Sequence, residues 1–182
     1  MKNTAKQLII LALVLLSVSC STFAKPTKIE YLLPAGFTGG VIILYNQADG
    51  STPEITADGT VRYRIPKDGF LKVNTPEPEA IYNYSFYYLD DKNNQTRIEY
   101  IQPHGSSLST GENLRSVDTI TEEERNNKVF AMNHRSIGFE ANGNKGPLYA
   151  FSIGLPKDSR YIYLRTLDKL DEINEQFSKK RP

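Results

Sequence analysis

The chain has little of several residues that often define small proteins. It holds one cysteine and no tryptophan among 182 residues. A single cysteine excludes an internal disulfide framework and any zinc or redox site built on paired cysteines. Basic residues number 22 and acidic residues 21, and this balance excludes a strongly basic nucleic-acid binder. No apolar run approaches the roughly 18 residues that a membrane-spanning helix needs.

The N-terminus predicts export. Lys2 and Lys6 precede Leu8–Leu16, which is an uninterrupted apolar run of nine residues. Nine residues span about 14 Å as a helix, which is roughly half of a bilayer core. A short basic segment, a short apolar segment and then small residues are the layout of a secretory signal peptide. We therefore expect residues 1–19 to be removed on export.

Two cleavage sites follow the apolar run. The segment 16–20 resembles a bacterial lipobox, in which small residues precede a cysteine that becomes lipidated, and the one cysteine of the chain stands there. We predict that Cys20 is lipidated and that residues 20–28 form a tether from the membrane to the folded part. The alternative is cleavage after Ala24, which gives a soluble periplasmic protein.

The residue after the cysteine bears on location. The residue that follows Cys20 is Ser21 and not an Asp. In a Gram-negative host, the resemblance to a lipobox then implies sorting to the outer membrane. We therefore expect a cell-envelope protein, an outer-membrane lipoprotein that faces the periplasm or the outside.

The remaining chain has the pattern of a β-rich domain. Val41–Tyr45 is a continuous apolar run, typical of a strand covered on both faces, and Val61–Ile65 alternates apolar and basic residues. Asp58-Gly59 and Asp68-Gly69 are hairpin signals. With eight or nine short strands, we predict a mainly β fold: an antiparallel β-sandwich, Ig-like or transthyretin-like, formed by one domain over residues 29–182. A partly open barrel is the alternative.

Few helices are expected. Thr166 predicts a cap for a closing helix over 167–178, whose apolar stripe repeats at helical spacing. We expect Tyr161–Arg165 to be the last strand. Thr121–Asn127 predicts one helical turn with a capping box, and Pro103–Thr119 predicts a long loop.

Two sequence blocks carry a family resemblance. Tyr31–Ile43 has a strand, a Pro-x-Gly-aromatic turn and a second strand, and Tyr63–Leu71 has a strand that enters a Pro-x-x-Gly turn. Over roughly residues 29–105 the chain resembles an uncharacterised bacterial domain of unknown function (DUF6843-like). The resemblance implies an exported β-rich domain and brings no catalytic residues.

Catalytic and metal-binding motifs are sparse. The sequence has no nucleophile elbow, no phosphate-binding loop and no metal-ligand spacing, so we predict no cofactor and no metal site. Only His104 and His134 have an ordinary pKa near neutrality. His104 lies near Ser106, which leaves a small hydrolase as an alternative, although two neighbouring groups without an orienting acid do not make a triad. We expect His134 to end a strand.

The aromatic strand Ile81–Leu89 is the clearest candidate for binding. Period-two alternation places four aromatic side chains on one face, and two interpretations stay open: core packing, or an exposed platform for a protein or glycan. The candidate binding surface consists of Tyr82, Tyr84 and Tyr88.

These observations favour an exported, lipid-anchored, non-enzymatic binding or structural module. We expect contact with the membrane through the N-terminal lipid, an envelope protein or glycan as partner, and no nucleic acid. Besides the hydrolase, an inhibitor or immunity-type protein is the remaining alternative.

Overall fold

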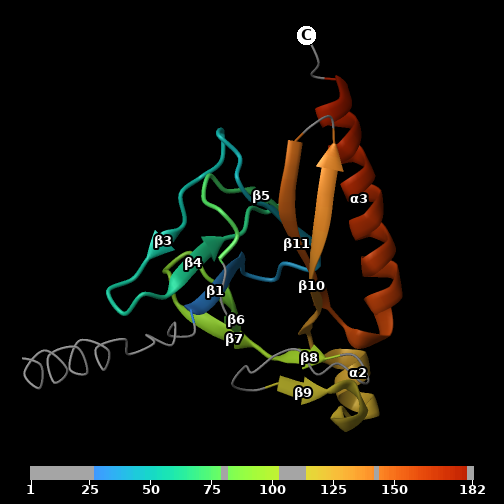
Figure 1. The fold of residues 1–182 in the computed structure, drawn as a ribbon. Coiled ribbons are helices and arrows are strands. Elements are labelled where there is room, and N and C mark those ends of the chain that lie inside the picture. Colours follow the sequence, from blue (N-terminus) through green and yellow to red (C-terminus); the bar gives the residue numbers. More distant parts are fainter. Residues whose placement is uncertain (1–26, 79–81, 103–113, 142–143, 180–182) are drawn as a thin grey trace, which may run out of the picture.

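A computed structural model describes residues 27–78, 82–102, 114–141 and 144–179. Within these ranges the chain forms two β-sheets and a long C-terminal helix (Figure 1). The first sheet has the strand order β3-β4-β1-β6-β7 and the second has the order β5-β2-β11-β10-β8-β9.

The elements have the following bounds. The first sheet contains β1 (Thr27–Pro34), β3 (Glu54–Ile55), β4 (Val61–Arg64), β6 (Tyr82–Leu89) and β7 (Gln95–Ile98). The second contains β2 (Gly39–Leu44), β5 (Phe70–Lys72), β8 (Tyr100–Gln102), β9 (Leu114–Ser116), β10 (Phe130–Ala141) and β11 (Asn144–Gly154). The helices are α2 (Glu122–Asn127) and α3 (Ser159–Lys179), with 3-10 turns at Val117–Thr119 and Pro156–Asp158.

The expectation of a mainly β fold with a C-terminal helix is confirmed, but the antiparallel arrangement is wrong. Strand β1 pairs in parallel with both of its neighbours, β4 and β6. In the second sheet β2 pairs in parallel with β5, whereas β10, β11 and β2 pair antiparallel. Both sheets are therefore mixed, unlike those of an Ig-like sandwich.

The mixed pairing arises because the early chain crosses from one sheet to the other. Strands β1 and β4 belong to the first sheet, and each is followed by a strand of the second sheet. Asp58-Gly59 joins β3 to β4 as the predicted hairpin. Asp68-Gly69 instead joins β4 to β5 across the two sheets, so the hairpin predicted there is wrong.

The two sheets pack face to face, and α3 covers the outer face of the second sheet. Strand β2 lies in the middle of this three-layer stack, which confirms the interpretation of its continuous apolar run. Val41 and Ile43 pack in the core between the sheets, whereas Ile42 and Leu44 pack with Ile173 of α3. Figure 1 shows α3 lying along β10 and β11.

Helix α3 is longer than expected. It begins at Ser159, so the strand predicted over Tyr161–Arg165 is its first part. Buried residues recur at Ile162, Thr166 and Ile173, which is helical spacing, and the apolar stripe therefore starts before the predicted cap. Thr166 is not a cap; its hydroxyl donates to the carbonyl of Ile162 within the helix.

The middle of the chain matches expectation in part. Helix α2 has the predicted capping box, in which Thr121 accepts from the Glu124 amide and the Glu124 carboxylate accepts from the Thr121 amide. The loop predicted over 103–119 lies partly outside the described residues, and its last part forms β9 and a 3-10 turn. No helix in the described ranges is long and apolar enough to cross a membrane.

Candidate functional site

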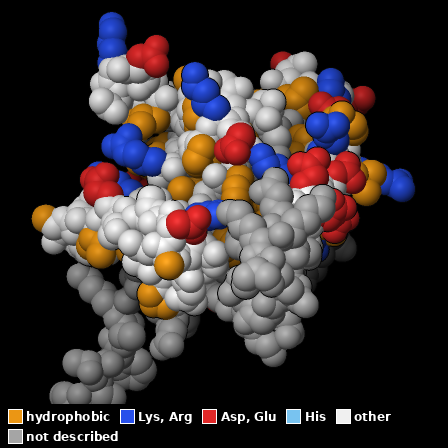
Figure 2. All heavy atoms as spheres, turned by 90° about the horizontal axis from the view of Figure 1, so that it is seen from above, with side chains coloured by type: hydrophobic (Ala, Val, Ile, Leu, Met, Phe, Trp, Pro, Cys, Tyr) orange, Lys and Arg blue, Asp and Glu red, His pale blue; other side chains and the backbone are white. Residues whose placement is uncertain are grey.

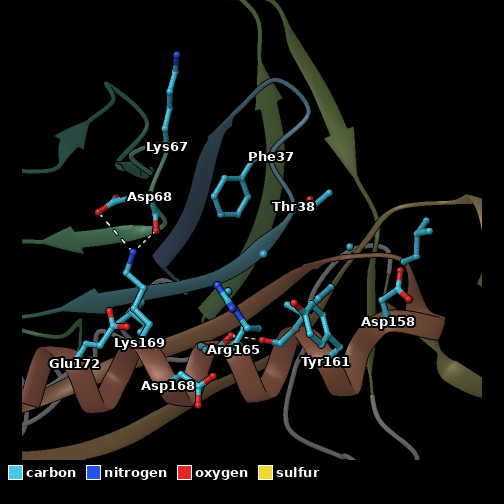
Figure 3. A pocket seen from close by; sticks show the side chains of 17 residues that line it. Phe37, Thr38, Lys67, Asp68, Asp158, Tyr161, Arg165, Asp168, Lys169 and Glu172 are labelled. Atoms are coloured by element: carbon cyan, nitrogen blue, oxygen red, sulfur yellow. Dashed lines mark hydrogen bonds and ion pairs between the residues drawn. The ribbon is translucent and has the colours of Figure 1, made fainter.

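An open groove of about 930 Å³ lies where two turns meet α3. One wall is the turn between β1 and β2, which carries Phe37 and Thr38, and the next is the turn between β4 and β5, which carries Lys67 and Asp68. The facing wall is α3 (Figure 3). We call this cavity the turn–helix groove. Both turns belong to the sequence blocks that carry the family resemblance.

The first turn is fixed by hydrogen bonds at both sides of Phe37. The Phe37 amide donates to the carbonyl of Pro34 at 3.0 Å, and Gly36 between them has a φ of 73°. The hydroxyl of Tyr88 donates to the Phe37 carbonyl at 2.7 Å. Burial raises the pKa of Tyr88, so this hydroxyl keeps its proton and remains a donor. Tyr88 thus supports the groove from β6.

The second turn touches the first. Gly69 has a φ of 75°, and its amide donates to the carbonyl of Pro66. A Cβ atom at this position would lie 2.4 Å from the carbonyl oxygen of Gly40 and 3.1 Å from the ring of Phe37. Glycine is therefore required twice at position 69, for the backbone angle and for the close approach.

Glycines also seat the helix against the sheet. A Cβ atom on Gly40 would lie within 2 Å of the Thr166 hydroxyl, and one on Gly154 would lie 2.3 Å from the side chain of Ile162. These two positions let α3 approach β2 and β11 closely. The groove therefore has a wall of regular structure on one side and two turns in close approach on the other.

Charged side chains of both signs line the groove. Lys169 bonds the carbonyl of Asp68 and lies 3.6 Å from its carboxylate, which ties α3 to the second turn. Arg165 extends from α3 toward the side of Phe37 (Figure 3), and no carboxylate among the described residues forms an ion pair with it. Tyr161, one helical turn before, is 65% exposed.

A second unusual cluster surrounds His134 in the interior. A bulge interrupts β10 between Met132 and Arg135, and Asn133 there has a φ of 58°. The bulge turns the imidazole inward, so the expectation that His134 ends a strand is wrong. Its Nε2 lies 3.1 Å from the hydroxyl of Tyr31, and the ring centroid lies 4.0 Å from that of Tyr84.

Burial among aromatic rings lowers the pKa of His134 to about 3. The imidazole is therefore neutral at ordinary pH and is held by packing against six rings. These belong to Tyr31, Tyr84, Phe86, Tyr100, Tyr149 and Phe151. A neutral, enclosed imidazole of this kind serves packing better than proton transfer with a substrate.

The predicted candidate residues fall in different places. Tyr84 is half-buried and stacks on Tyr31, and Tyr88 is half-buried behind the groove, so both pack against the core. The side chain of Tyr82, together with Cys20 and His104, lies outside the described residues. Binding through the tyrosine surface therefore stays a prediction.

The groove was not predicted from the sequence. Its turn residues were recognisable by their Gly and Pro, but nothing in the local pattern indicates that both turns meet one helix. A helix predicted over residues 161–165 would have placed Ile162 on its buried face and Tyr161 on its exposed face. Among the described residues, no group of three or more His, Cys, Asp or Glu side chains could hold a metal ion.

Comparisons with known proteins bear on fold and family. The Family of unknown function (DUF6843) matches residues 25–140, a stretch that contains both turns of the groove and ends before α3. A crystal structure described as "Putative Lipoprotein from Bacillus anthracis" is similar with a TM-score of 0.53 at 12% sequence identity, over 86% of this chain and 97% of that chain. At this identity the likeness concerns the fold. No curated protein matches the chain.

Proposed function

We propose that this chain, which belongs to the Family of unknown function (DUF6843), is a lipid-anchored protein of the cell envelope that binds a partner in the turn–helix groove and performs no catalysis. The observation that carries the proposal is the groove itself. It is open, about 930 Å³ in volume, and its walls present an exposed tyrosine and an arginine that forms no ion pair with any described carboxylate.

The chemistry of the groove supports binding over catalysis. Its side chains offer charges and aromatic surface, and its described lining contains neither histidine nor cysteine. His134, the one described histidine, is half-buried among aromatic rings on other elements. The hydrolase alternative depends on His104, which lies outside the described residues.

The position of the groove suits a protein tethered at Cys20. Seven residues, 20–26, precede the first described residue and reach at most about 24 Å when extended. Strand β1 then runs for eight residues, about 26 Å, and ends at the turn that forms the groove. The groove thus lies at the end of β1 remote from the anchor. That the Bacillus anthracis neighbour is described as a lipoprotein supports the tether.

Site-specific photocrosslinking in growing cells tests the proposal. A photoreactive amino acid at Tyr161 should give an adduct of defined size in the envelope fraction, because this exposed ring lines the groove. The matched control is Ile55, which is 68% exposed on β3 and does not line the groove. The same adduct from both positions, or none from Tyr161, would contradict the proposal.

A further inference from the structure

We infer that the occupant of the turn–helix groove is an extended peptide segment of a partner protein, with charges of both signs and an acidic side chain seated on Arg165. The inference rests on the proposed binding function and names the ligand class for it. It follows from the length of the groove, the state of its cations and the mixture of its charges.

The groove follows α3 for several turns. Its helical lining residues recur at three- or four-residue spacing from Tyr161 through Arg165 and Lys169 to Glu172. Eleven residues of helix rise about 17 Å, which matches about five residues of an extended peptide at 3.3 Å each. A chain-like ligand therefore uses the whole helix face, whereas a compact small molecule leaves most of it empty.

The two cations on the helix wall are in different states. Lys169 is held by Asp68 of the second turn, through both the backbone carbonyl and the carboxylate. Arg165 lines the same wall one turn earlier and has no such partner among the described side chains. A guanidinium presents donors in a planar fork that a carboxylate matches with two parallel hydrogen bonds. Arg165 is thus the position that selects an acidic group.

Aromatic side chains flank this position. Figure 3 shows the Phe37 ring on the turn side of the groove, across from Arg165, and the Tyr161 ring on the helix side, next to Arg165 along α3. Rings so placed offer apolar contact to the side chains before and after an acidic residue. A peptide meets both demands because its side chains alternate along the backbone.

The charge mixture excludes the other polymers of an envelope. Among the described residues, three basic and four acidic side chains line the groove. Figure 2 likewise shows basic and acidic side chains in proximity across the face that it presents. A phosphate-rich polymer is repelled by the four carboxylates, and a neutral glycan leaves desolvated charges without counter-charges. A peptide with both signs can pair with them.

Selection from a phage-displayed library of random linear peptides tests the inference on the full chain purified in detergent. We expect enrichment of peptides that carry an acidic residue between apolar or aromatic ones. Arg165→Glu should lower the affinity for these peptides by at least about tenfold and enrich basic residues at the same position, because the charge that selects is reversed. The control Arg160→Glu, an exposed position on the same helix outside the groove, should keep the original selection.

Three results would overturn the inference. They are the absence of enrichment, the same enriched peptides for Arg165→Glu as for the wild type, and the same loss for Arg160→Glu. A parallel oligosaccharide array separates this failure from that of the proposed function. Glycan binding without peptide binding, lost on Tyr161→Ala, would refute the peptide and keep the groove as a binding site; no ligand in either screen, with no adduct from Tyr161 in cells, would refute both.

Discussion

At the scale of single residues, His134 has the most unusual environment. A bulge in β10 directs an ionisable, half-buried ring among aromatic side chains, where its neutral form is favoured. Between about pH 3 and pH 6.5, His134 is therefore unprotonated in the native state and protonated in the unfolded chain. This difference makes the stability of the protein depend on pH in a defined range.

We expect the free energy of unfolding to fall on acidification from about pH 6.5 toward pH 3. The pKa of His134 is lowered to about 3 in the native state and is about 6.5 in the unfolded chain. Its contribution is therefore intact above pH 6.5 and declines by about 1.4 kcal/mol per pH unit below it. Denaturant unfolding of wild type and His134→Phe across this range measures the difference.

The comparison with His134→Phe isolates the imidazole from the carboxylates. Asp58 and Glu124 also have pKa values lowered to about 2, so they too weaken the fold in acid, but equally in both proteins. The phenylalanine variant should show a flatter profile between pH 6.5 and pH 5. Identical slopes for the two proteins would show that His134 is not responsible.

Gly69 is the residue on which the contact between the two turns depends. Gly69→Ala should destabilise the fold by about 2–5 kcal/mol, since the new Cβ meets the Gly40 carbonyl in addition to the backbone cost of a positive φ. Gly59→Ala is the matched control, because Gly59 has a similar φ of 84° with open space around it. That change should cost about 1–2 kcal/mol.

Thermal or denaturant unfolding of both alanine variants distinguishes the cost of a positive φ from the cost of the contact with Gly40. Equal losses would mean that only the backbone angle matters at position 69. A larger loss for Gly69→Ala, together with loss of the groove adduct at Tyr161, would show that the two turns must touch for the site to form.

At the scale of elements, the sequence predicted which faces are buried better than which strands are neighbours. The unbroken apolar run of β2 correctly indicated cover on both faces. Of the two interpretations of the alternation in β6, core packing is the one that Phe86, Tyr84 and Tyr88 follow. Side-chain period reports only the environment of each face. It carries no information on whether the next strand pairs with it or crosses to the other sheet, and the parallel partners of β1 were missed for that reason.

Helix α3 shows the same limit at its start. The residues Tyr161–Leu164 are aromatic or branched, which favours a strand locally, and packing of Ile162 and Thr166 against β11 and β2 overrides that preference. Because the start of this helix was not predicted, the groove that it lines was not predicted either. The glycine-rich turns were interpreted as backbone chemistry. Of the opposing wall, Tyr161 and Arg165 were assigned to a strand, whereas Lys169 and Glu172 lay in the predicted helix.

Strand β6 offers a direct test of the core between the sheets. Phe86 is 1% exposed, and its ring lies 5.1 Å from that of Phe151 in the opposite sheet. Phe86→Ala should therefore lower the free energy of unfolding by about 3–5 kcal/mol. Tyr87→Ala, on the other face of the same strand and half-buried, should cost less. A loss below about 1 kcal/mol for Phe86→Ala would contradict its interior position.

At the scale of the whole molecule, the proposed anchor sets which end faces outward. We predict that a fatty-acid probe fed to growing cells labels the wild-type protein and not Cys20→Ala, because the thiol of this residue carries the lipid. The variant should also leave the membrane fraction, since stable attachment depends on the acyl chains. A mature wild-type N-terminus at Lys25 would contradict lipidation and indicate a soluble protein.

The seat of α3 has a consequence for synthesis. Helix α3 follows the strands of the second sheet in the sequence, yet it covers Ile42, Leu44 and Leu148 in strands made before it. Until α3 docks, these apolar side chains of the second sheet are exposed and can bind chaperones or aggregate with other chains. A chain cut short before Ser159 has neither that cover nor a groove. We therefore expect a chain truncated before Ser159 to lose ligand binding at the groove, because one of its walls is then missing.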